Sequence, residues 1–224
     1  MGESLTEGFV CSNLSDDLSG LSFKDLPIHS VEDDSVKISI KAASLNFPDL
    51  LMTQGKYQNK PELPFALGME GAGIVSEIGS NVEFLKKGDE AMFGSWGHGA
   101  IAKDIVLPSG MVSLKPENYS FAEAAAFKTV YLTAFVGLIR RGNLKDGETL
   151  LVHGASGGVG MAAVELGKLY GAKVIATGTS DEKLKVVKSW GADHVINTFK
   201  NKKTSFREQV KELTDGKGAD VIYD

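Results

Sequence analysis

Cysteine is almost absent from this sequence of 224 residues, in which Cys11 stands alone. A single thiol can form neither an internal disulfide nor a cysteine-rich zinc site, and it fits a reducing compartment. Long apolar runs are missing too. No stretch approaches the roughly 18 residues of a membrane span, and the N-terminus lacks the basic and apolar regions of a signal peptide. We therefore expect a soluble, cytoplasmic protein with no membrane partner.

Basic charge is also scarce. The chain carries 24 Lys and Arg against 29 Asp and Glu, for a net charge of −5, and its basic residues form no tract. Phosphate backbones are bound by clustered Lys and Arg, so this balance argues against a nucleic-acid partner.

The first part of the chain, from Glu7 to Thr149, has the pattern of short strands separated by turns. Apolar and polar residues alternate at Val36, Ile38 and Ile40. Many short strands punctuated by Gly and Pro indicate a small, partly open β-barrel. The expected strands lie in GFVCS, LSFKDL, VKISIKAAS, GAGIVSEIG, EAMFG and HGAIAKDIVL. Two helices are expected to close this part, one from a capping box at Ser120 and one from about Val130 to Ile139.

From Glu148 onward the order changes to alternating strands and helices, ending in a fourth strand at ADVIYD. This alternation is typical of right-handed crossovers that build a parallel sheet. We expect an α/β Rossmann domain with about four parallel strands, incomplete because a doubly wound sheet has further strands after the fourth. The predicted domains are 1–143 and 144–224, and the fourth strand is expected to be an exposed edge.

The link between the first of these strands and its helix is rich in glycine. Gly154, Gly157 and Gly160 are spaced GxxGxxG. Glycine permits a tight turn and a close approach of backbone N–H groups to a diphosphate, and the helix N-terminus adds its positive dipole end. The residues expected to bind this diphosphate are Gly154, Ser156, Gly157, Gly158, Val159 and Gly160. A glycine-rich turn without a ligand is the alternative, because the spacing differs from the common GxGxxG.

The end of the second strand bears on the choice of dinucleotide. An NAD site places an acidic residue about 20 residues past the glycines, to bind the ribose 2′-hydroxyl. Here Thr177, Gly178, Thr179 and Ser180 occupy that place, and Lys183 follows one helical turn later. Hydroxyls and an ammonium group suit a 2′-phosphate, so NADP(H) is favoured over NAD(H). The alternative is that Lys183 is a solvated helix charge beside two acidic residues.

Several motifs in the same order resemble those of the medium-chain dehydrogenase/reductase superfamily, and within it the zinc-free, zeta-crystallin-like quinone oxidoreductase branch. They are AASLNFPDLLMTQGKY, LPFALGMEGAGIVSEIG, KKGDEAMF, HGASGGVG, GTSDEKL, GADHVIN and GKGADVIYD. The resemblance implies a GroES-like catalytic barrel beside a Rossmann domain, with the substrate in the cleft between them. It also implies that members continue for about a third more chain, which completes the sheet and forms the usual homodimer edge. We therefore expect this sequence to be C-terminally truncated.

The resemblance also bears on metal binding. Zinc-dependent relatives take ligands from a Cys in the segment that matches Leu45 to Asp49 and from a His in a GHE motif. Here the first segment is LNFPD and the second is Gly68, Met69 and Glu70, and the four histidines of the chain are scattered. Neither a thiolate nor an imidazole is in place, so we expect no metal. Glu70 is expected to be a buried or paired carboxylate.

Without a metal to polarise an alcohol, reduction of an activated acceptor is favoured. By position, the family pattern places Asn46 and Tyr57 near the nicotinamide and substrate. The Asn46 amide can donate to a ribose hydroxyl or a carbonyl, and the Tyr57 hydroxyl can donate to a developing oxyanion. The alternatives are that Tyr57 caps a loop and that Asn46 satisfies turn backbone groups.

Two further positions follow from the resemblance. Thr133 matches a position near the nicotinamide, although its hydroxyl could equally bond a carbonyl one turn back. Thr198 and Phe199 stand where the family commonly has a Tyr that covers adenine, so that contact is expected to be altered or shifted to Phe199.

The sequence thus predicts an NADPH-dependent, zinc-independent reductase of quinones or α,β-unsaturated carbonyls. One alternative is a reductase of enoyl thioesters, for which Lys56, Lys60 and Lys86 could meet a CoA phosphate, although surface charge explains them as well. Another is a truncated chain that binds NADPH or a second protein without catalysis.

Overall fold

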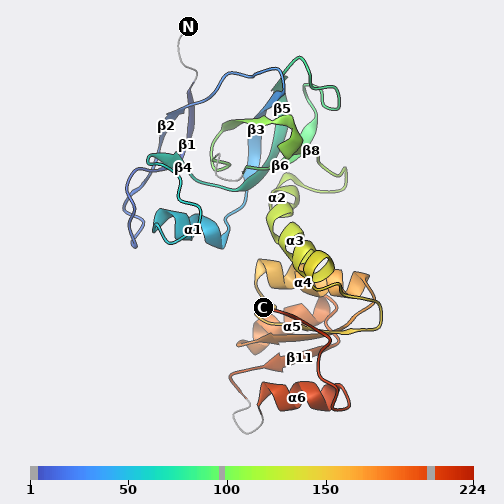
Figure 1. Cartoon of the computed structure of the whole chain (residues 1–224). Coiled ribbons are helices and arrows are strands. Elements are labelled where there is room, and N and C mark those ends of the chain that lie inside the picture. Colours follow the sequence, from blue (N-terminus) through green and yellow to red (C-terminus); the bar gives the residue numbers. More distant parts are fainter. Residues whose placement is uncertain (1–4, 96–98, 201–204) are drawn as a thin grey trace. The chain divides into compact units, whose positions relative to one another are not determined.

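The structure is a computed structural model that describes residues 5–95, 99–200 and 205–224. Contacts within the chain divide it into two compact units, Met1–Thr129 and Val130–Asp224 (Figure 1). The domain boundary that we expected between residues 143 and 144, from the order of elements, stays a prediction.

The first unit is built on two antiparallel sheets. The smaller sheet has the order β2-β1-β4, and the larger has the order β7-β3-β5-β6-β8. An isolated bridge between Gly8 and Ala102 ties β1 to the segment that precedes β7. This is the GroES-like, partly open barrel that the sequence predicts. The strands are β1 (Leu5–Cys11), β2 (Leu21–Pro27), β3 (Ser35–Ala43), β4 (Phe65–Ala66), β5 (Glu70–Ile78), β6 (Glu90–Gly94), β7 (Asp104–Pro108) and β8 (Val112–Leu114).

The barrel core follows from the alternation along its strands. Val36 and Ile38 of β3 are fully buried and pack with Val75, Phe93 and Leu107 from neighbouring strands. Side chains at every second residue of a strand point to the same face, so the apolar positions of β3 share one interior.

Four elements of this unit differ from the sequence prediction. The strand expected in HGAIAKDIVL is shorter, because only Asp104–Pro108 is a strand, and His98 lies outside the described residues. The short strands β4 and β8 were not anticipated, and neither was helix α1 (Phe47–Thr53). This helix has Pro48 in its first turn, and the Asp49 carboxylate accepts a hydrogen bond from the Asn46 backbone N–H at 2.7 Å.

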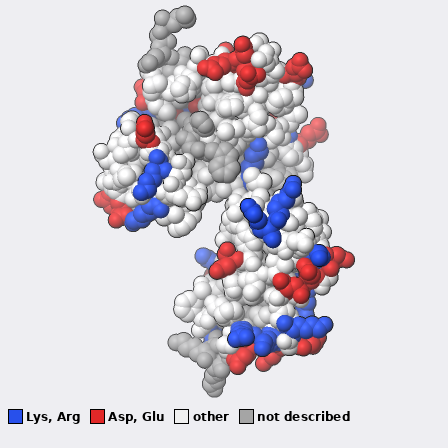
Figure 2. All heavy atoms as spheres, viewed as in Figure 1, with Lys and Arg blue, Asp and Glu red and all other residues white. Residues whose placement is uncertain are grey.

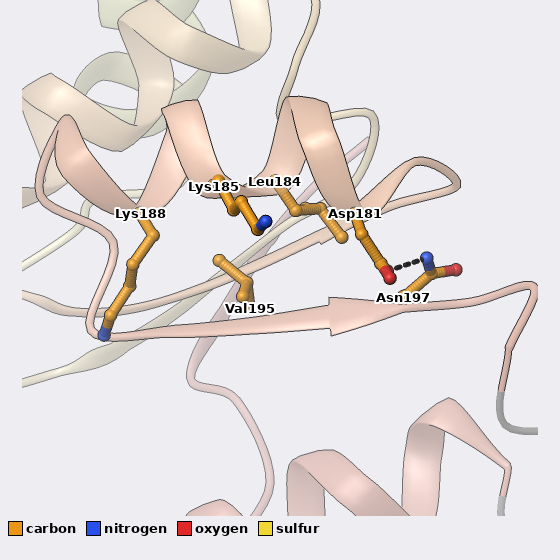
Figure 3. A pocket seen from close by; sticks show the side chains of 6 residues that line it. All are labelled: Asp181, Leu184, Lys185, Lys188, Val195 and Asn197. Carbon is orange, nitrogen blue, oxygen red and sulfur yellow. Dashed lines mark hydrogen bonds between the residues drawn. The ribbon is translucent and has the colours of Figure 1, made fainter.

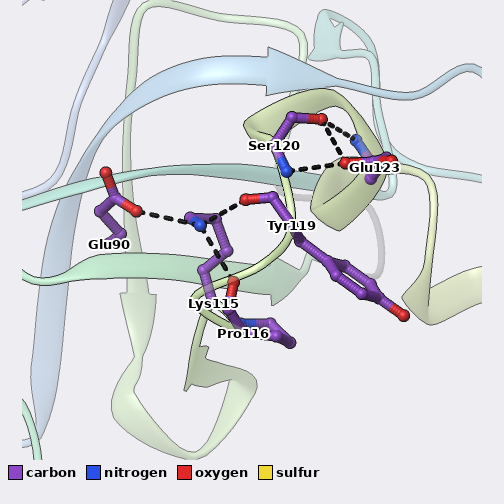
Figure 4. Close-up of polar contacts among 6 residues, drawn as sticks. All are labelled: Glu90, Lys115, Pro116, Tyr119, Ser120 and Glu123. Carbon is purple, nitrogen blue, oxygen red and sulfur yellow. Dashed lines mark hydrogen bonds and ion pairs between the residues drawn. The ribbon is translucent and has the colours of Figure 1, made fainter.

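Helix α2 (Phe121–Ala125) begins at the predicted capping box. The Glu123 N–H donates to Ser120 Oγ at 3.2 Å, and the Ser120 N–H donates to Glu123 Oε2 at 2.8 Å (Figure 4). The preceding segment is fixed by buried Lys115. Its Nζ donates to the carbonyl oxygens of Pro116 and Tyr119 and pairs with Glu90 Oε2 at 3.0 Å. These partners use the ammonium hydrogens of a group that is costly to bury unpaired.

The second unit contains a parallel sheet of four strands in the order β11-β10-β9-β12. This is the Rossmann-type order that the alternating pattern predicts, with β12 at one edge. The elements are β9 (Thr149–Val152), α4 (Gly158–Leu169), β10 (Lys173–Gly178), α5 (Asp181–Ser189), β11 (His194–Asn197), α6 (Phe206–Leu213) and β12 (Val221–Tyr223). Helix α4 begins at Gly158, three residues before the expected Met161, so Gly158 and Gly160 lie inside it.

Both faces of this sheet are covered by helices. Leu150 and Val174 face one core, which they share with α4 and with Val187 of α5. Leu151 and Ile175, their immediate neighbours in sequence, face a second core with Val210 of α6. The near-continuous apolar strands are explained by burial on both faces.

The helix expected from Val130 to Ile139 is interrupted. Helix α3 (Lys128–Phe135) passes into a π-helical segment, Val136–Arg141, in which the Gly142 N–H donates to the Gly137 carbonyl oxygen at 2.8 Å. A Cβ atom on Gly137 would lie 2.4 Å from the Tyr223 ring, so glycine allows β12 to pack here. Periodicity alone does not reveal such a local widening.

Within the described residues, no helix is both long and apolar enough to cross a membrane. Acidic and basic side chains occur together on the visible face of each unit (Figure 2).

Candidate functional site

The glycine-rich turn connects β9 to α4 in the second unit. Gly154 adopts φ +58°, a conformation that favours glycine, and its carbonyl oxygen accepts from the Gly157 N–H at 3.0 Å. The Ala155 N–H donates to the carbonyl oxygen of Thr177 at 3.0 Å, which holds the turn against the end of β10. The turn is therefore fixed by backbone contacts at both of its sides.

The third glycine is required by packing. A Cβ atom on Gly160 would lie 2.5 Å from the Gly154 carbonyl oxygen and 2.7 Å from Ala155 Cα, both backbone atoms. Gly167, which the sequence analysis did not single out, plays a similar part further along, since its Cβ would lie 2.6 Å from Leu150 Cδ2. Helix α4 therefore lies close to β9 because two of its residues have no side chain.

The outer surface of the turn carries few side chains, because three of its exposed residues are glycines. Gly154, Ser156, Gly157 and Gly158 are exposed, and Val159 is half-buried. The N–H groups of the first turn of α4 have no acceptor within the helix, and the helix dipole adds positive charge at this end. Exposed N–H groups at the N-terminus of a 12-residue helix form a suitable cradle for a phosphate group. The chain therefore offers what a dinucleotide diphosphate needs.

The ends of β10 and β11 lie beside each other at the same edge of the sheet. Thr179 is exposed, and Ser180 caps α5 by accepting from the Lys183 N–H at 3.4 Å. The Thr198 N–H and Oγ1 both donate to the Gly178 carbonyl oxygen, at 2.9 and 3.3 Å. The parallel sheet thus brings the predicted ribose-binding residues to the edge that carries the glycine turn.

Asp181, at the start of α5, is the nearest acidic residue to these hydroxyls in sequence. Its carboxylate accepts hydrogen bonds from Lys200 Nζ and Asn197 Nδ2, the second of which is drawn in Figure 3. The Lys200 and Asn197 hydrogen bonds lower the pKa of Asp181 below its usual value. Its negative charge is therefore partly compensated within the unit, which reduces the repulsion that it would exert on a bound phosphate.

An open pocket of about 370 Å³ lies between α5 and β11 (Figure 3). It is lined by Asp181, Leu184, Lys185, Lys188, Val195 and Asn197. None of the predicted site residues lines it, so the pocket adjoins the predicted ribose site without being part of it.

The first unit holds a buried polar cluster around Glu70, whose side chain is 1% exposed. Its Oε1 accepts from Ser44 Oγ at 2.5 Å and from Asn46 Nδ2 at 2.9 Å, and its Oε2 accepts from the Thr129 N–H at 2.7 Å. Asn46 Nδ2 also donates to Ser44 Oγ at 3.1 Å. We call these four residues the Glu70 cluster. The sequence indicated a buried or paired carboxylate, but Asn46 and Glu70 are 24 positions apart in the chain, and nothing in the sequence indicated that they touch.

Asp49 lies beside this cluster and is 2% exposed. Its Oδ1 atom is buried and has no hydrogen-bond partner in the described part of the chain. Burial raises the pKa of Asp49, and the charge of Glu70 raises it further. A carboxyl group in this setting gives up its proton less readily than an exposed one.

The other predicted residues occupy separate places. Tyr57 packs in the first unit against a cluster that includes Met52, Phe65 and Met69. Thr133 is exposed on α3 in the second unit. Lys56 forms an ion pair with Asp16 at 2.6 Å, which supports the interpretation of Lys56 as surface charge. Roles for Asn46, Tyr57 and Thr133 stay predictions.

Among the described residues, no group of three or more His, Cys, Asp or Glu is arranged to hold a metal ion. Met69 presents a thioether where zinc-dependent relatives present an imidazole, and it packs in an apolar cluster with Cys11. The residues present do not fit a zinc ion at this place.

Comparison with known proteins agrees with this architecture. Residues 32–117 match the family model described as the alcohol dehydrogenase GroES-like domain, and residues 158–224 match the model described as zinc-binding dehydrogenase. A quinone oxidoreductase-like protein 2 homolog from Nematostella vectensis is 41% identical over 190 residues, which cover 84% of this chain and 51% of that protein. The chain therefore spans about half the length of this curated relative.

Several solved structures of similar fold are oxidoreductases. A probable oxidoreductase from Mycobacterium abscessus has a TM-score of 0.88 at 34% identity, covering 98% of this chain and 69% of that one. Escherichia coli quinone oxidoreductase complexed with NADPH has a TM-score of 0.85 at 31% identity, covering 99% and 66%. The CurK enoyl reductase has a TM-score of 0.87 at 30% identity, covering 97% and 66%.

The fold and the glycine turn define an oxidoreductase scaffold, a GroES-like barrel followed by a Rossmann-type dinucleotide-binding unit. The chain belongs to the medium-chain dehydrogenase/reductase superfamily, in its quinone oxidoreductase-like branch.

Proposed function

We propose that this chain binds NADPH and forms part of a zinc-independent reductase. The reductase transfers hydride to a quinone or to an α,β-unsaturated carbonyl. The observation that carries the proposal is the turn from β9 to α4, which exposes backbone N–H groups at a helix N-terminus. The E. coli quinone oxidoreductase, which has been crystallised with NADPH, has the same fold and supports the choice of cofactor.

The preference for NADPH over NADH rests on the residues after β10. No carboxylate stands at Thr179 or Ser180, and the nearby Asp181 is paired with Lys200. Lys183 is exposed on the first turn of α5, where an ammonium group can approach a 2′-phosphate. An NAD site would instead present an acidic residue to the ribose.

The bound dihydronicotinamide would supply the hydride. The chain would bind the diphosphate at Gly154, Ser156, Gly157, Gly158, Val159 and Gly160, and the 2′-phosphate at Thr179, Ser180 and Lys183, with Thr198 beside them. Thr133 is proposed as a further cofactor contact. The Tyr57 hydroxyl would donate to the oxygen on which negative charge develops.

The direct test is to titrate NADPH and NADH against the 224-residue chain, following nucleotide fluorescence. We expect NADPH to bind about tenfold more tightly than NADH, since one charge-assisted hydrogen bond contributes about that factor. A chain that binds neither nucleotide contradicts the proposal.

Turnover is followed by the fall in NADPH absorbance with an ortho-quinone or a simple enone, and a chelator should leave the rate unchanged. The CurK enoyl reductase favours an enoyl thioester as the second candidate acceptor. Faster turnover of crotonyl-CoA than of a simple enone would favour that candidate over a free quinone or enone.

A further inference from the structure

The strand β11 forms one edge of the parallel sheet in the second unit. Among the described residues, it pairs with β10 alone. Alternate N–H and C=O groups of an edge strand point away from the sheet and have no partner within it. Edge strands are commonly protected by lysine or proline, and His194–Asn197 contains neither. The edge of β11 can therefore accept one more strand.

The face of β11 toward α5 is partly open. The pocket of about 370 Å³ follows this face, from Lys188 near the start of the strand to Asp181 and Asn197 at its end (Figure 3). Two apolar side chains line it, Leu184, which is 2% exposed, and Val195, which is 37% exposed and points toward α5. Successive side chains of a strand point to opposite faces, so a strand added beside β11 would direct every second side chain toward this pocket.

The charge that lines the pocket is positive. Asp181 is the acidic side chain that lines it, and both of its carboxylate oxygens already accept hydrogen bonds from other side chains. Lys188 donates to the backbone carbonyl oxygen of Asp193, which uses one of three ammonium hydrogens. Lys185 is exposed, and within the described ranges it forms no hydrogen bond or ion pair. Two ammonium groups thus have hydrogens left for a partner.

The spacing of these lysines matches that of an extended chain. Lys185 and Lys188 are three residues apart on α5, so their Cβ atoms lie about 5–6 Å apart. In a strand, side chains two residues apart share a face and lie about 6.6 Å apart. Two carboxylates at alternate positions of an added strand can therefore each meet one lysine, while their methylene groups cover Val195.

We propose that β11 and the pocket beside it bind an extended peptide segment that has acidic residues at alternate positions. The segment joins the sheet as a fifth strand. Its backbone pairs with the free edge of β11, and its carboxylates meet Lys185 and Lys188. The backbone supplies affinity, and the lysines select acidic side chains. None of the residues proposed to bind the cofactor lines this pocket, so the two proposals can be tested independently.

The probe is a capped peptide of about six residues, the length of a typical strand, in which glutamate and threonine alternate. It carries a rhodamine dye, and its binding to the 224-residue chain is followed by fluorescence anisotropy. The matched control peptide has lysine in place of glutamate. We expect the control to bind at least about tenfold more weakly, because the pocket repels it. Equal binding of the two peptides overturns the proposal.

Pairing with the edge of β11 is tested by N-methylation of the probe. In an extended chain, the N–H groups of alternate residues point to opposite sides. Of two peptides, one methylated at every glutamate and one at every threonine, only one can lose its hydrogen bonds to β11. We expect one to bind at least about tenfold more weakly than the unmethylated probe and the other to stay within about threefold of it. Equal affinities would show that charge alone holds the peptide, which contradicts strand addition.

The role of the lysines is tested in the chain itself. The double variant Lys185→Gln with Lys188→Gln should bind the glutamate peptide about tenfold more weakly. Lys217→Gln is the matched control, because Lys217 is exposed in the same unit but does not line the pocket. Thermal unfolding shows whether each variant is folded. A similar loss of affinity in the control variant would overturn the role of the pocket.

A further measurement needs no variant. Backbone amide exchange with water, followed by NMR, should slow in β11 when the chain is saturated with the glutamate peptide. It should stay unchanged in β12, which lies at the opposite edge of the sheet. Slowing in neither strand, or equal slowing in both, contradicts the proposal.

Discussion

Nδ1 of His153 lies 2.9 Å from Oγ1 of Thr177, across the ends of β9 and β10. Thr177 is 2% exposed, so its hydroxyl is used inside the second unit. The sequence placed Thr177 among four residues that could meet the cofactor ribose. The structure leaves Thr179 and Ser180 as the hydroxyls at the surface, and Ser180 also caps α5.

Two glycine substitutions should separate packing from ligand binding. Gly160→Ala forces a Cβ against backbone at 2.5 Å, so we expect it to lower the free energy of unfolding by about 1–3 kcal/mol. Gly157→Ala meets the Gly154 carbonyl oxygen at 3.5 Å, an ordinary contact, so it should fold nearly as well yet weaken NADPH binding about tenfold. Urea unfolding and fluorescence titration measure the two effects. Equal loss of stability in both variants would contradict this assignment.

Lys183→Ala should weaken NADPH binding about tenfold and leave NADH binding nearly unchanged, because only NADPH carries the 2′-phosphate. The difference should shrink as salt is added, since the interaction is between exposed charges. Lys185→Ala is the matched control, because Lys185 is also exposed on α5 but lines the pocket beside β11. A similar effect of both substitutions would indicate general electrostatics rather than a specific contact.

Tyr57→Phe should lower kcat for a quinone or enone by about tenfold to a hundredfold, because the hydroxyl that would stabilise the oxyanion is lost. The ring remains in its cluster with Met52 and Phe65, so thermal stability and NADPH affinity should stay close to wild type. Tyr119→Phe, in the same unit, is the control and should leave kcat unchanged. An unchanged kcat in Tyr57→Phe would rule out the donor role.

Asp49 makes the stability of the chain depend on pH. Its pKa is raised in the folded state by burial, so the folded chain retains this proton at pH values where the unfolded chain has lost it. The favourable contribution of the neutral carboxyl is present below the ordinary pKa of 3.8 and is lost as pH rises through the folded pKa. Relative to wild type, Asp49→Asn should therefore become more stable as pH rises from the acid range to neutrality. Urea unfolding across that range tests this, and a difference that does not vary with pH would contradict it.

Lys115→Met should lower the free energy of unfolding by about 2–3 kcal/mol. The substitution leaves the Pro116 and Tyr119 carbonyl oxygens without their donor and removes the partner of Glu90. The loss is smaller than for a fully buried pair, because Glu90 is about half exposed and can be solvated. Lys87→Met, at an exposed lysine of the same unit, should change stability by less than about 0.5 kcal/mol, as measured by urea unfolding.

The architecture of the second unit was predictable from sequence because its signals are local. Each of β9 to β12 is a short apolar run, each intervening helix has its own periodicity, and Gly154, Gly157 and Gly160 mark the turn. The order β11-β10-β9-β12 is the order of the first four strands of a Rossmann-type sheet. The close fit of Gly137 to Tyr223 was not predictable, because it joins residues that are far apart in the chain.

The sequence by itself determined the fold class, the glycine turn and the residue types at the predicted site, because periodicity, capping and turn chemistry act over a few residues. Only the tertiary structure decided what those residues can do. The Thr177 hydroxyl is hydrogen-bonded to His153, and the Asp181 carboxylate to Lys200. The Asn46 amide is hydrogen-bonded to Glu70 and Ser44. A hydrogen bond consumes a donor and an acceptor, and which groups are consumed depends on partners that folding brings together from distant parts of the chain.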